Sequence, residues 1–290
     1  MNLLNIIKEK RKLRLNKNLG IRNIFQMDFK RKLKNTLIWT FIMILIGLVY
    51  YGVYPSMKDL VTDKLNSMPP EILNFVSSSG ELDMSDFNYY FAMIFSIIQI
   101  PLYIYAASSG SALLHDEEKS GSIEYLYSQD VTRNDIYISK SLVSLVNLII
   151  IFSSSFLVAV VMGKSLSSDT FSFNTIRNCF LFSLCGILFF FSLGLFLSAL
   201  LNKHKEPSKI STGLFLGGYL LGYISLLIDR INFLKVFSPI HLISSDVIAH
   251  SMVFGIGEGE FGIIGPVVYL ILSLVLIIAG GVLYNKKDLT

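Results

Sequence analysis

Six long apolar segments, spread over the whole chain, constrain its fold more than any other feature. Each lacks Asp, Glu, Lys and Arg altogether, and the shortest holds 19 residues; they are residues 35–57, 87–115, 141–163, 178–202, 210–228 and 261–285. An α-helix needs roughly 20 apolar residues to cross a hydrocarbon core of about 30 Å. Six such segments do not fit a soluble domain of 290 residues. Because they are continuously apolar rather than alternating, they predict helices and not a membrane β-barrel.

The sequence therefore predicts an all-α, polytopic membrane protein with six transmembrane helices. We expect a basic cytoplasmic N-terminus over residues 1–34 and a single transmembrane domain over residues 35–290. The expected spans are residues 35–57, 88–114, 136–163, 177–201, 210–228 and 263–285. The external segment 55–87 is either a cap over an exit path or an ordinary loop, and residues 229–260 fit a re-entrant or interfacial hairpin.

The distribution of positive charge predicts the orientation in the membrane. Of the 25 Lys and Arg residues, 19 fall on the side that holds both termini and 6 on the other side. The excess of positive charge in cytoplasmic loops then places both termini in the cytoplasm of a bacterial plasma membrane. Eleven of these residues lie within residues 1–36, beside the first span. That location favours contact with an anionic membrane surface over nucleic-acid binding.

Residues 21–34 predict an amphipathic helix that lies in the membrane interface before the first span. Its apolar residues fall near one helical face: Ile21, Ile24, Phe25, Phe29 and Leu33. The basic residues expected at the membrane surface are Arg22, Lys30, Arg31, Lys32 and Lys34. A helix with a basic face and an apolar face binds in the interface plane rather than crossing the membrane. The alternative is a disordered basic tail.

Two motifs that resemble nucleotide-binding sites by letter do not meet the requirements of such sites. Gly163–Ser165 ends like a phosphate-binding loop, but Val158 stands where that loop needs its first glycine. The GEGEFG sequence at residues 257–262 fits a dinucleotide fingerprint by letter, yet its two glutamates would repel phosphate. The four histidines show no metal-ligand spacing, so we expect no metal site. We therefore expect no cofactor in this chain.

The uncharged spans and one glycine-rich span carry further predictions. The absence of Asp, Glu, Lys and Arg from the six apolar segments argues against an ion-coupled carrier, because such carriers usually keep ionisable residues in the membrane as relays. Polar residues such as Gln99, Ser111 and Asn147 either line a path or, as we expect, bond between helices. The fifth span is expected to pack closely against another helix, within the chain or in a dimer, through small residues with G-x-x-x-G spacing: Gly213, Gly217, Gly218 and Gly222.

A dense charged segment, HDEEKSGSIEYLYSQDVTRND at residues 115–135, interrupts the apolar chain between spans two and three. Its helical pattern places Ile123, Leu126 and Tyr127 on one face, with acidic residues around them. Thr132 is a suitable N-cap for the helix that enters the third span, with Asp135 in its first turn. A short cytoplasmic helix with an apolar ridge and an acidic rim is suited to docking a protein partner. The alternative is a helix lying on the membrane surface.

This segment resembles the corresponding loop of the permease subunits of type 2 ABC exporters. That loop reads as an acidic pair, a glycine, a glutamate, a leucine pair, then proline, a small residue and arginine. The matching residues are Glu117, Glu118, Gly121, Ser122, Glu124, Leu126, Val131, Thr132 and Arg133, closed by Lys140. Asp130 replaces the proline and Tyr127 the second leucine. FSPIHLI at residues 237–243 and YNKKDL at 284–289 resemble a later segment and the tail of the same family.

The resemblance implies a permease that exports its substrate with energy from a separate ATPase. It also implies that the amphipathic helix over residues 21–34 is an elbow helix before the first span. Residues 116–128 would be the coupling helix, with Glu117, Glu118, Gly121, Ile123, Glu124, Leu126, Tyr127 and Arg133 binding the partner. Two ABC ATP-binding subunits, which bind ATP and Mg²⁺, would act on a homodimer or heterodimer of permeases. An amphipathic peptide, such as an antimicrobial or toxin peptide, or a lipid-like molecule is the expected cargo. The alternatives are an autonomous carrier or channel, and a membrane-embedded enzyme.

Overall fold

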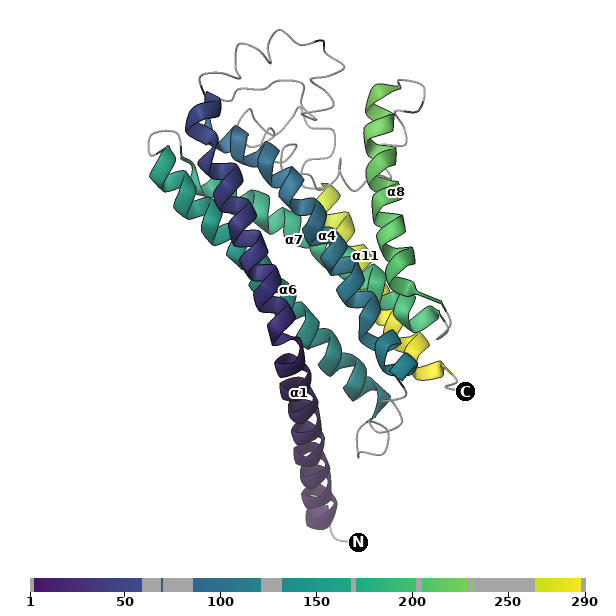
Figure 1. Cartoon of the computed structure of the whole chain (residues 1–290). Coiled ribbons are helices and arrows are strands. Elements are labelled where there is room, and N and C mark those ends of the chain that lie inside the picture. Colours follow the sequence, from purple (N-terminus) through teal and green to yellow (C-terminus); the bar gives the residue numbers. More distant parts are fainter. Residues whose placement is uncertain are drawn as a thin grey trace.

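Six long helices make up most of the chain that the structure describes (Figure 1). This computed structural model describes residues 3–58, 69, 86–120, 132–167, 171–201, 205–228, 231 and 264–287. The helices are α1 (Leu3–Gly52), α4 (Phe87–Ser120), α6 (Arg133–Leu166), α7 (Phe173–Leu200), α8 (Pro207–Leu227) and α11 (Ile264–Lys286). No strand occurs in these ranges, so the predicted all-α class is confirmed.

Five helices in the described part are long and apolar enough to cross a membrane. They cover Ile21–Lys58, Tyr90–His115, Arg133–Leu166, Phe173–Leu200 and Pro266–Lys286. The chain is therefore a multi-pass membrane protein. The predicted fifth span forms helix α8, which is not among these five, so the sixth crossing stays a prediction. At about 1.5 Å per residue, the 21 residues of α8 would cover the roughly 30 Å of a hydrocarbon core.

The first helix differs from the sequence prediction. We expected an elbow helix over residues 21–34 and a separate span after it, but α1 runs through both without interruption. The physical reason is the absence of a helix breaker: neither Gly nor Pro occurs between Ile21 and Ile46. Helix interiors break or kink mainly at such residues. The separate elbow helix is therefore not confirmed.

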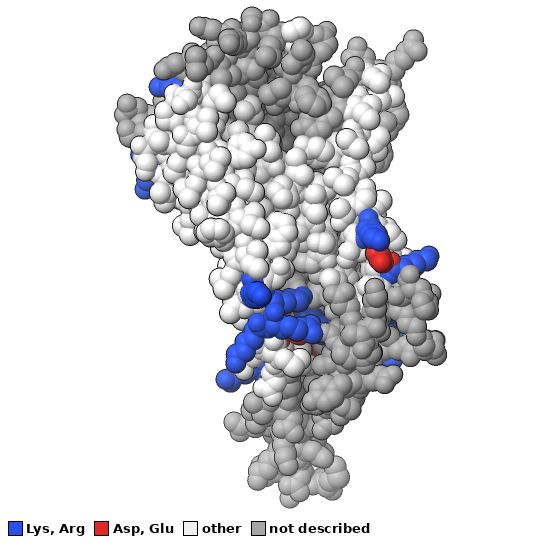
Figure 2. All heavy atoms as spheres, viewed as in Figure 1, with Lys and Arg blue, Asp and Glu red and all other residues white. Residues whose placement is uncertain are grey.

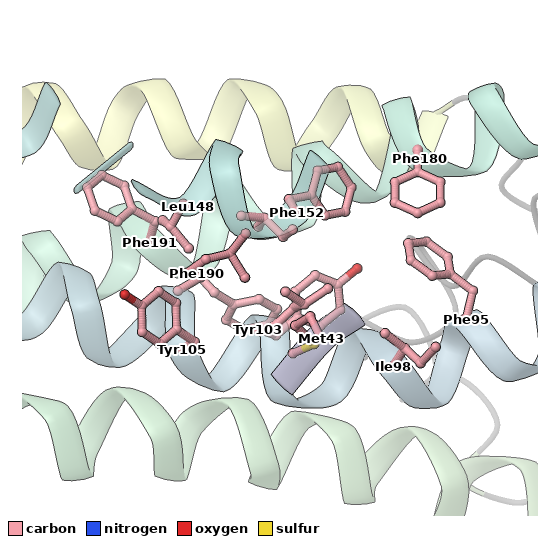
Figure 3. Close-up of a cluster of buried hydrophobic side chains, with 14 of the residues drawn as sticks. Met43, Phe95, Ile98, Tyr103, Tyr105, Leu148, Phe152, Phe180, Phe190 and Phe191 are labelled. Carbon is pink, nitrogen blue, oxygen red and sulfur yellow. The ribbon is translucent and has the colours of Figure 1, made fainter. Parts of the chain in front are cut away.

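The helices form a bundle in which α4 and α7 pack most extensively on each other, α1 packs on α6, and α11 packs on α7. Figure 3 shows part of the buried core, to which aromatic rings contribute heavily. The ring of Phe180 lies 4.2 Å from that of Phe95 and 4.9 Å from those of Phe152 and Phe156, measured between centroids. Outside this core, α1 and α11 expose large apolar side chains such as Phe41 and Ile278, as helices facing lipid do.

Two glycines allow the close approach of α4 and α7. A Cβ atom added at Gly110 would overlap the backbone carbonyl oxygen of Phe191, and one added at Gly194 would overlap that of Ala107. Small residues permit such contact between the backbones of membrane helices. The tightest approach recorded at a described glycine thus lies at this crossing, which the sequence analysis did not predict.

Polar residues also link the helices, as expected for part of the set. Gln99 donates from its side-chain amide to the Ser183 hydroxyl, and the hydroxyls of Ser111 and Ser211 lie 2.7 Å apart, joining α4 to α7 and to α8. Asn147 is different, because its buried side-chain amide has no hydrogen-bond partner in the described part of the chain. The expectation of bonds between helices therefore holds at Gln99 and Ser111 but not at Asn147.

Candidate functional site

The ends of four helices lie towards the side of the molecule where the sequence predicts docking of a partner. Figure 1 shows the first turn of α1, the last turns of α4 and α11, and the first turn of α6 towards the same end of the molecule. The predicted second span continues as helix beyond residue 114, so Glu117 and Glu118 belong to the last turns of α4. The remaining predicted docking residues before Arg133 lie outside the described residues: Gly121, Ile123, Glu124, Leu126 and Tyr127.

The start of α6 is fixed by the cap that the sequence predicts. The Asp135 backbone N–H donates to Thr132 Oγ1 at 3.3 Å, and the Thr132 backbone N–H donates to Asp135 Oδ2 at 3.2 Å. This reciprocal pair is a capping box, which satisfies backbone donors that the first turn of a helix leaves free. Helix α6 accordingly begins at Arg133, next to the predicted start at Asn134. The cap therefore fixes the residue at which the chain leaves the docking segment and enters α6.

A buried ion pair joins α1 to the beginning of α6. Lys140 Nζ lies 2.9 Å from Asp28 Oδ2, and both side chains are only 2% exposed. Arg31 lies on the other side of the carboxylate, 3.2 Å from Asp28 Oδ1. Sequence reasoning did not single out this pair for the site. The signal available was that Asp28 is the sole acidic residue within the basic segment 21–34.

Two hydrogen bonds extend the contact between these helices. Ser139 Oγ donates to the carbonyl oxygen of Ile21 at 3.2 Å, and Lys32 Nζ donates to Ser144 Oγ at 2.9 Å. One face of the 21–32 segment therefore packs on α6 rather than on a membrane surface. The predicted set of surface residues divides accordingly, because Lys32 is half-buried in this contact and Arg31 contacts Asp28.

The other predicted surface residues, Arg22, Lys30 and Lys34, are exposed. Figure 2 shows Lys and Arg side chains gathered over this part of the molecule, below a broad white surface without charge. The boundary between the two is where a membrane surface is expected, since charged side chains are costly in hydrocarbon. Binding of lipid headgroups by these residues stays a prediction.

The glycines of α8 are divided between packed and open positions. Gly213 and Gly217 are exposed, and a Cβ atom added at either would meet no heavy atom within 4 Å. Gly218 is half-buried and Gly222 is buried. Among the described residues, Gly213 and Gly217 therefore make no close helix contact, which leaves a dimer contact as the prediction for them.

Metal-ligating side chains and cysteines are two further features of the described ranges that could carry chemistry. No group of three or more His, Cys, Asp and Glu side chains lies close enough there to hold a metal ion. Both cysteines, Cys179 and Cys185, lie on α7, and Cys179 is buried in the core. The described ranges contain an apolar helix bundle and the two helix ends, of α4 and α6, that flank the charged segment in the sequence.

Comparison with protein families identifies this arrangement. A family model described as ABC-2 family transporter protein matches residues 22–289. The chain belongs to the ABC-2 transporter family. It is a permease of the ABC-2 type, which is a membrane subunit for transport rather than an enzyme, and such permeases act with an ATP-binding subunit. No curated protein and no solved structure matches the chain.

Proposed function

We propose that this ABC-2 permease is the membrane subunit of an ATP-driven exporter and forms its translocation path. The observation that carries the proposal is the position of the two helix ends that flank the charged segment: the last turns of α4 and the first turn of α6 lie at the same end of the bundle as the exposed basic residues of α1. Because cytoplasmic loops are rich in Lys and Arg, we place this end, and both termini, in the cytoplasm. An ATP-binding subunit can reach the segment there.

The segment acts as a coupling helix in this proposal. Its acidic rim (Glu117, Glu118 and Glu124) and its apolar ridge (Ile123, Leu126 and Tyr127) dock on the ATP-binding subunit. Two such subunits bind ATP and Mg²⁺, and their closure moves the segment and the helices that flank it. Nucleotide drives the change because it binds one of the two states more tightly than the other.

Two permeases pair in the proposed transporter, as a homodimer or a heterodimer. The open backbone at Gly213 and Gly217 supports α8 as part of the contact, because exposed glycines on a membrane helix let a second helix approach closely. Exposed leucines on the same helix, among them Leu214 and Leu221, would add apolar area to such a contact.

The proposed cargo is an amphipathic peptide or a lipid-like molecule. The apolar segments of the spans contain no Asp, Glu, Lys or Arg. Such a path gives no fixed charge to bind a bare ion, whereas apolar and aromatic side chains suit an amphipathic cargo. The alternative function is an autonomous carrier or channel, which would act without an ATPase.

Charge reversal in the coupling helix tests the docking. The tagged permease is purified gently from its native membrane as wild type, as Glu117→Lys with Glu124→Lys, and as Glu206→Lys. Glu206 is the matched control, because it is an exposed acid outside the segment whose surface pair with Lys209 contributes little to stability. We expect ATPase activity to co-elute with wild type and control but not with the double variant. Equal ATPase activity with the double variant would contradict docking at this segment.

A further inference from the structure

The last residues of the described chain lie against the first residues of α6. The guanidinium of Arg133 donates through one Nη atom to the carbonyl oxygen of Lys287 at 2.7 Å and reaches that of Asn285 at 3.5 Å. One helical turn further along, the Tyr137 hydroxyl donates to the Ile277 carbonyl oxygen at 2.8 Å. The beginning of α6, just after the charged segment, is thereby attached to the end of α11.

The side chain of Lys287 continues the connection to α7. Its Nζ atom donates to the carbonyl oxygen of Leu201 at 2.7 Å and reaches that of Ser198 at 3.5 Å. The last carbonyl groups of a helix have no partner within the helix, and a cation there also interacts favourably with the helix dipole. Lys287 therefore acts as a cap for the end of α7, supplied by residues far away in the sequence.

The same turn of α7 also holds the other flank of the charged segment. The backbone N–H of His115, near the end of α4, donates to Ser198 Oγ at 3.1 Å, and the His115 side chain is buried. Both flanks of the segment, at His115 and at Arg133, are thus connected to Ser198–Leu201. One connection is direct and the other runs through Lys287.

We propose that Arg133 and Lys287 form a coupling tie that transmits movement of the charged segment to α7 and α11. The inference rests on the proposed function, because it assumes that an ATP-binding subunit moves this segment. Without the tie, a movement at the start of α6 would be shared through side-chain packing and neutral hydrogen bonds such as that of Tyr137. With it, charge-assisted hydrogen bonds connect the exit of the segment to the ends of two further helices, and such bonds are about twice as strong as neutral ones.

The tie assigns Arg133 a contact within the chain, in addition to the docking contact that the family resemblance implies. It also explains the NKK sequence at residues 285–287, in which the two lysines differ in their environment: Lys286 is exposed, whereas Lys287 is half-buried with its Nζ atom on α7. Lys287 is a positioning residue in this scheme. Lys286 is its matched control, one residue away and of the same chemistry.

The test measures how far a change at the nucleotide reaches along α7. Cys179 and Cys185 are replaced by alanine, and Asn174→Cys, at an exposed position in the first turn of α7, serves as the reporter. The permease is purified with its ATP-binding partner. The rate of reporter modification by a maleimide is then compared without nucleotide and with ATP and vanadate. Partner retention and ATPase activity are measured on the same samples.

We expect a nucleotide-dependent change in this rate for the reporter protein and for its Lys286→Met and Lys287→Arg variants. Lys287→Met and Arg133→Gln should reduce that change about fivefold or more, the scale of a typical coupling between sites. Lys287 is outside the predicted docking set, so the ATPase partner should stay bound to Lys287→Met. Rescue by Lys287→Arg separates loss of the tie from a folding defect. An undiminished response in both Lys287→Met and Arg133→Gln would overturn the tie and leave the proposed function standing. Absence of any co-purifying ATPase would overturn the proposed function and the tie with it.

Discussion

Asp28 and Lys140, which are 112 residues apart in the sequence, form a buried ion pair at 2.9 Å between α1 and α6. Arg31 contributes a second positive charge to the same carboxylate. Removing one partner of a buried pair is strongly destabilising, because the other charge stays in a poorly solvated environment, whereas replacing both by apolar residues is often neutral.

We predict that Asp28→Asn lowers the free energy of unfolding by about 3–5 kcal/mol. Lys140→Met should cost less, because Asp28 keeps its contact with Arg31. The double variant Asp28→Leu with Lys140→Met should recover most of the loss. Thermal unfolding in detergent, followed by circular dichroism, measures all three variants. The control is Lys30→Met, at an exposed position two residues from Asp28 on the same helix. A double variant no more stable than Asp28→Asn would contradict this account.

The α4–α7 crossing gives a prediction about glycine. Gly110→Ala and Gly194→Ala should each destabilise the bundle by about 1–3 kcal/mol or more, the usual cost of overpacking, because each new methyl group would overlap a backbone carbonyl oxygen. Gly213→Ala is the matched control, since its methyl group would meet open space. The melting temperatures of the three variants in detergent decide the question. A control as unstable as Gly110→Ala would show that the crossing is not the cause.

The open glycines of α8 lead to a prediction about the dimer. Gly213→Leu with Gly217→Leu should leave the folded permease intact, because no atom of the described part of the chain lies within 4 Å of either Cβ position. The same change should weaken pairing of two permeases if their α8 helices approach there. Light scattering in detergent, corrected for the detergent mass, reports the dimer fraction. Unchanged pairing in a stably folded double variant would move the dimer contact elsewhere.

The capping box at the start of α6 predicts a local effect. Thr132→Ala should cost about 1 kcal/mol, the typical value for loss of an N-cap side chain, and Thr132→Ser should cost much less. Hydrogen exchange of the backbone amides of Asp135 and Ile136 measures the fraying of this turn. Exchange rates that are equal in the alanine variant and in wild type would mean that the cap does not hold the turn in solution.

The features that could be predicted from the sequence are those set by local composition. Each predicted span coincides with a helix because a long apolar segment in a membrane has few alternatives to helix. The Thr132 cap could be predicted because all its atoms lie within four consecutive residues. The continuous α1 could also be expected, since residues 21–46 contain neither Gly nor Pro, and an amphipathic pattern alone does not end a helix.

The features that could not be predicted depend on which helices become neighbours. Asp28 reads as a single acid in a basic segment until α1 packs on α6 and places Lys140 beside it. Gly110 and Gly194 lack the G-x-x-x-G spacing by which the α8 glycines predict close packing. Their role is visible only where α4 crosses α7. The Lys287 contact with Leu201 likewise joins residues 86 positions apart. A single sequence does not show which helices become neighbours, and therefore does not show which residues pair between them.

The central claim is that this permease works with a separate ATP-binding subunit. Native mass spectrometry of the tagged chain, released from its native membrane in mild detergent, tests it most directly. The account predicts a complex that contains two permeases and two ATP-binding subunits. A permease that is released alone, and that conducts ions or transports a solute after reconstitution without ATP, would contradict the account in favour of an autonomous channel or carrier.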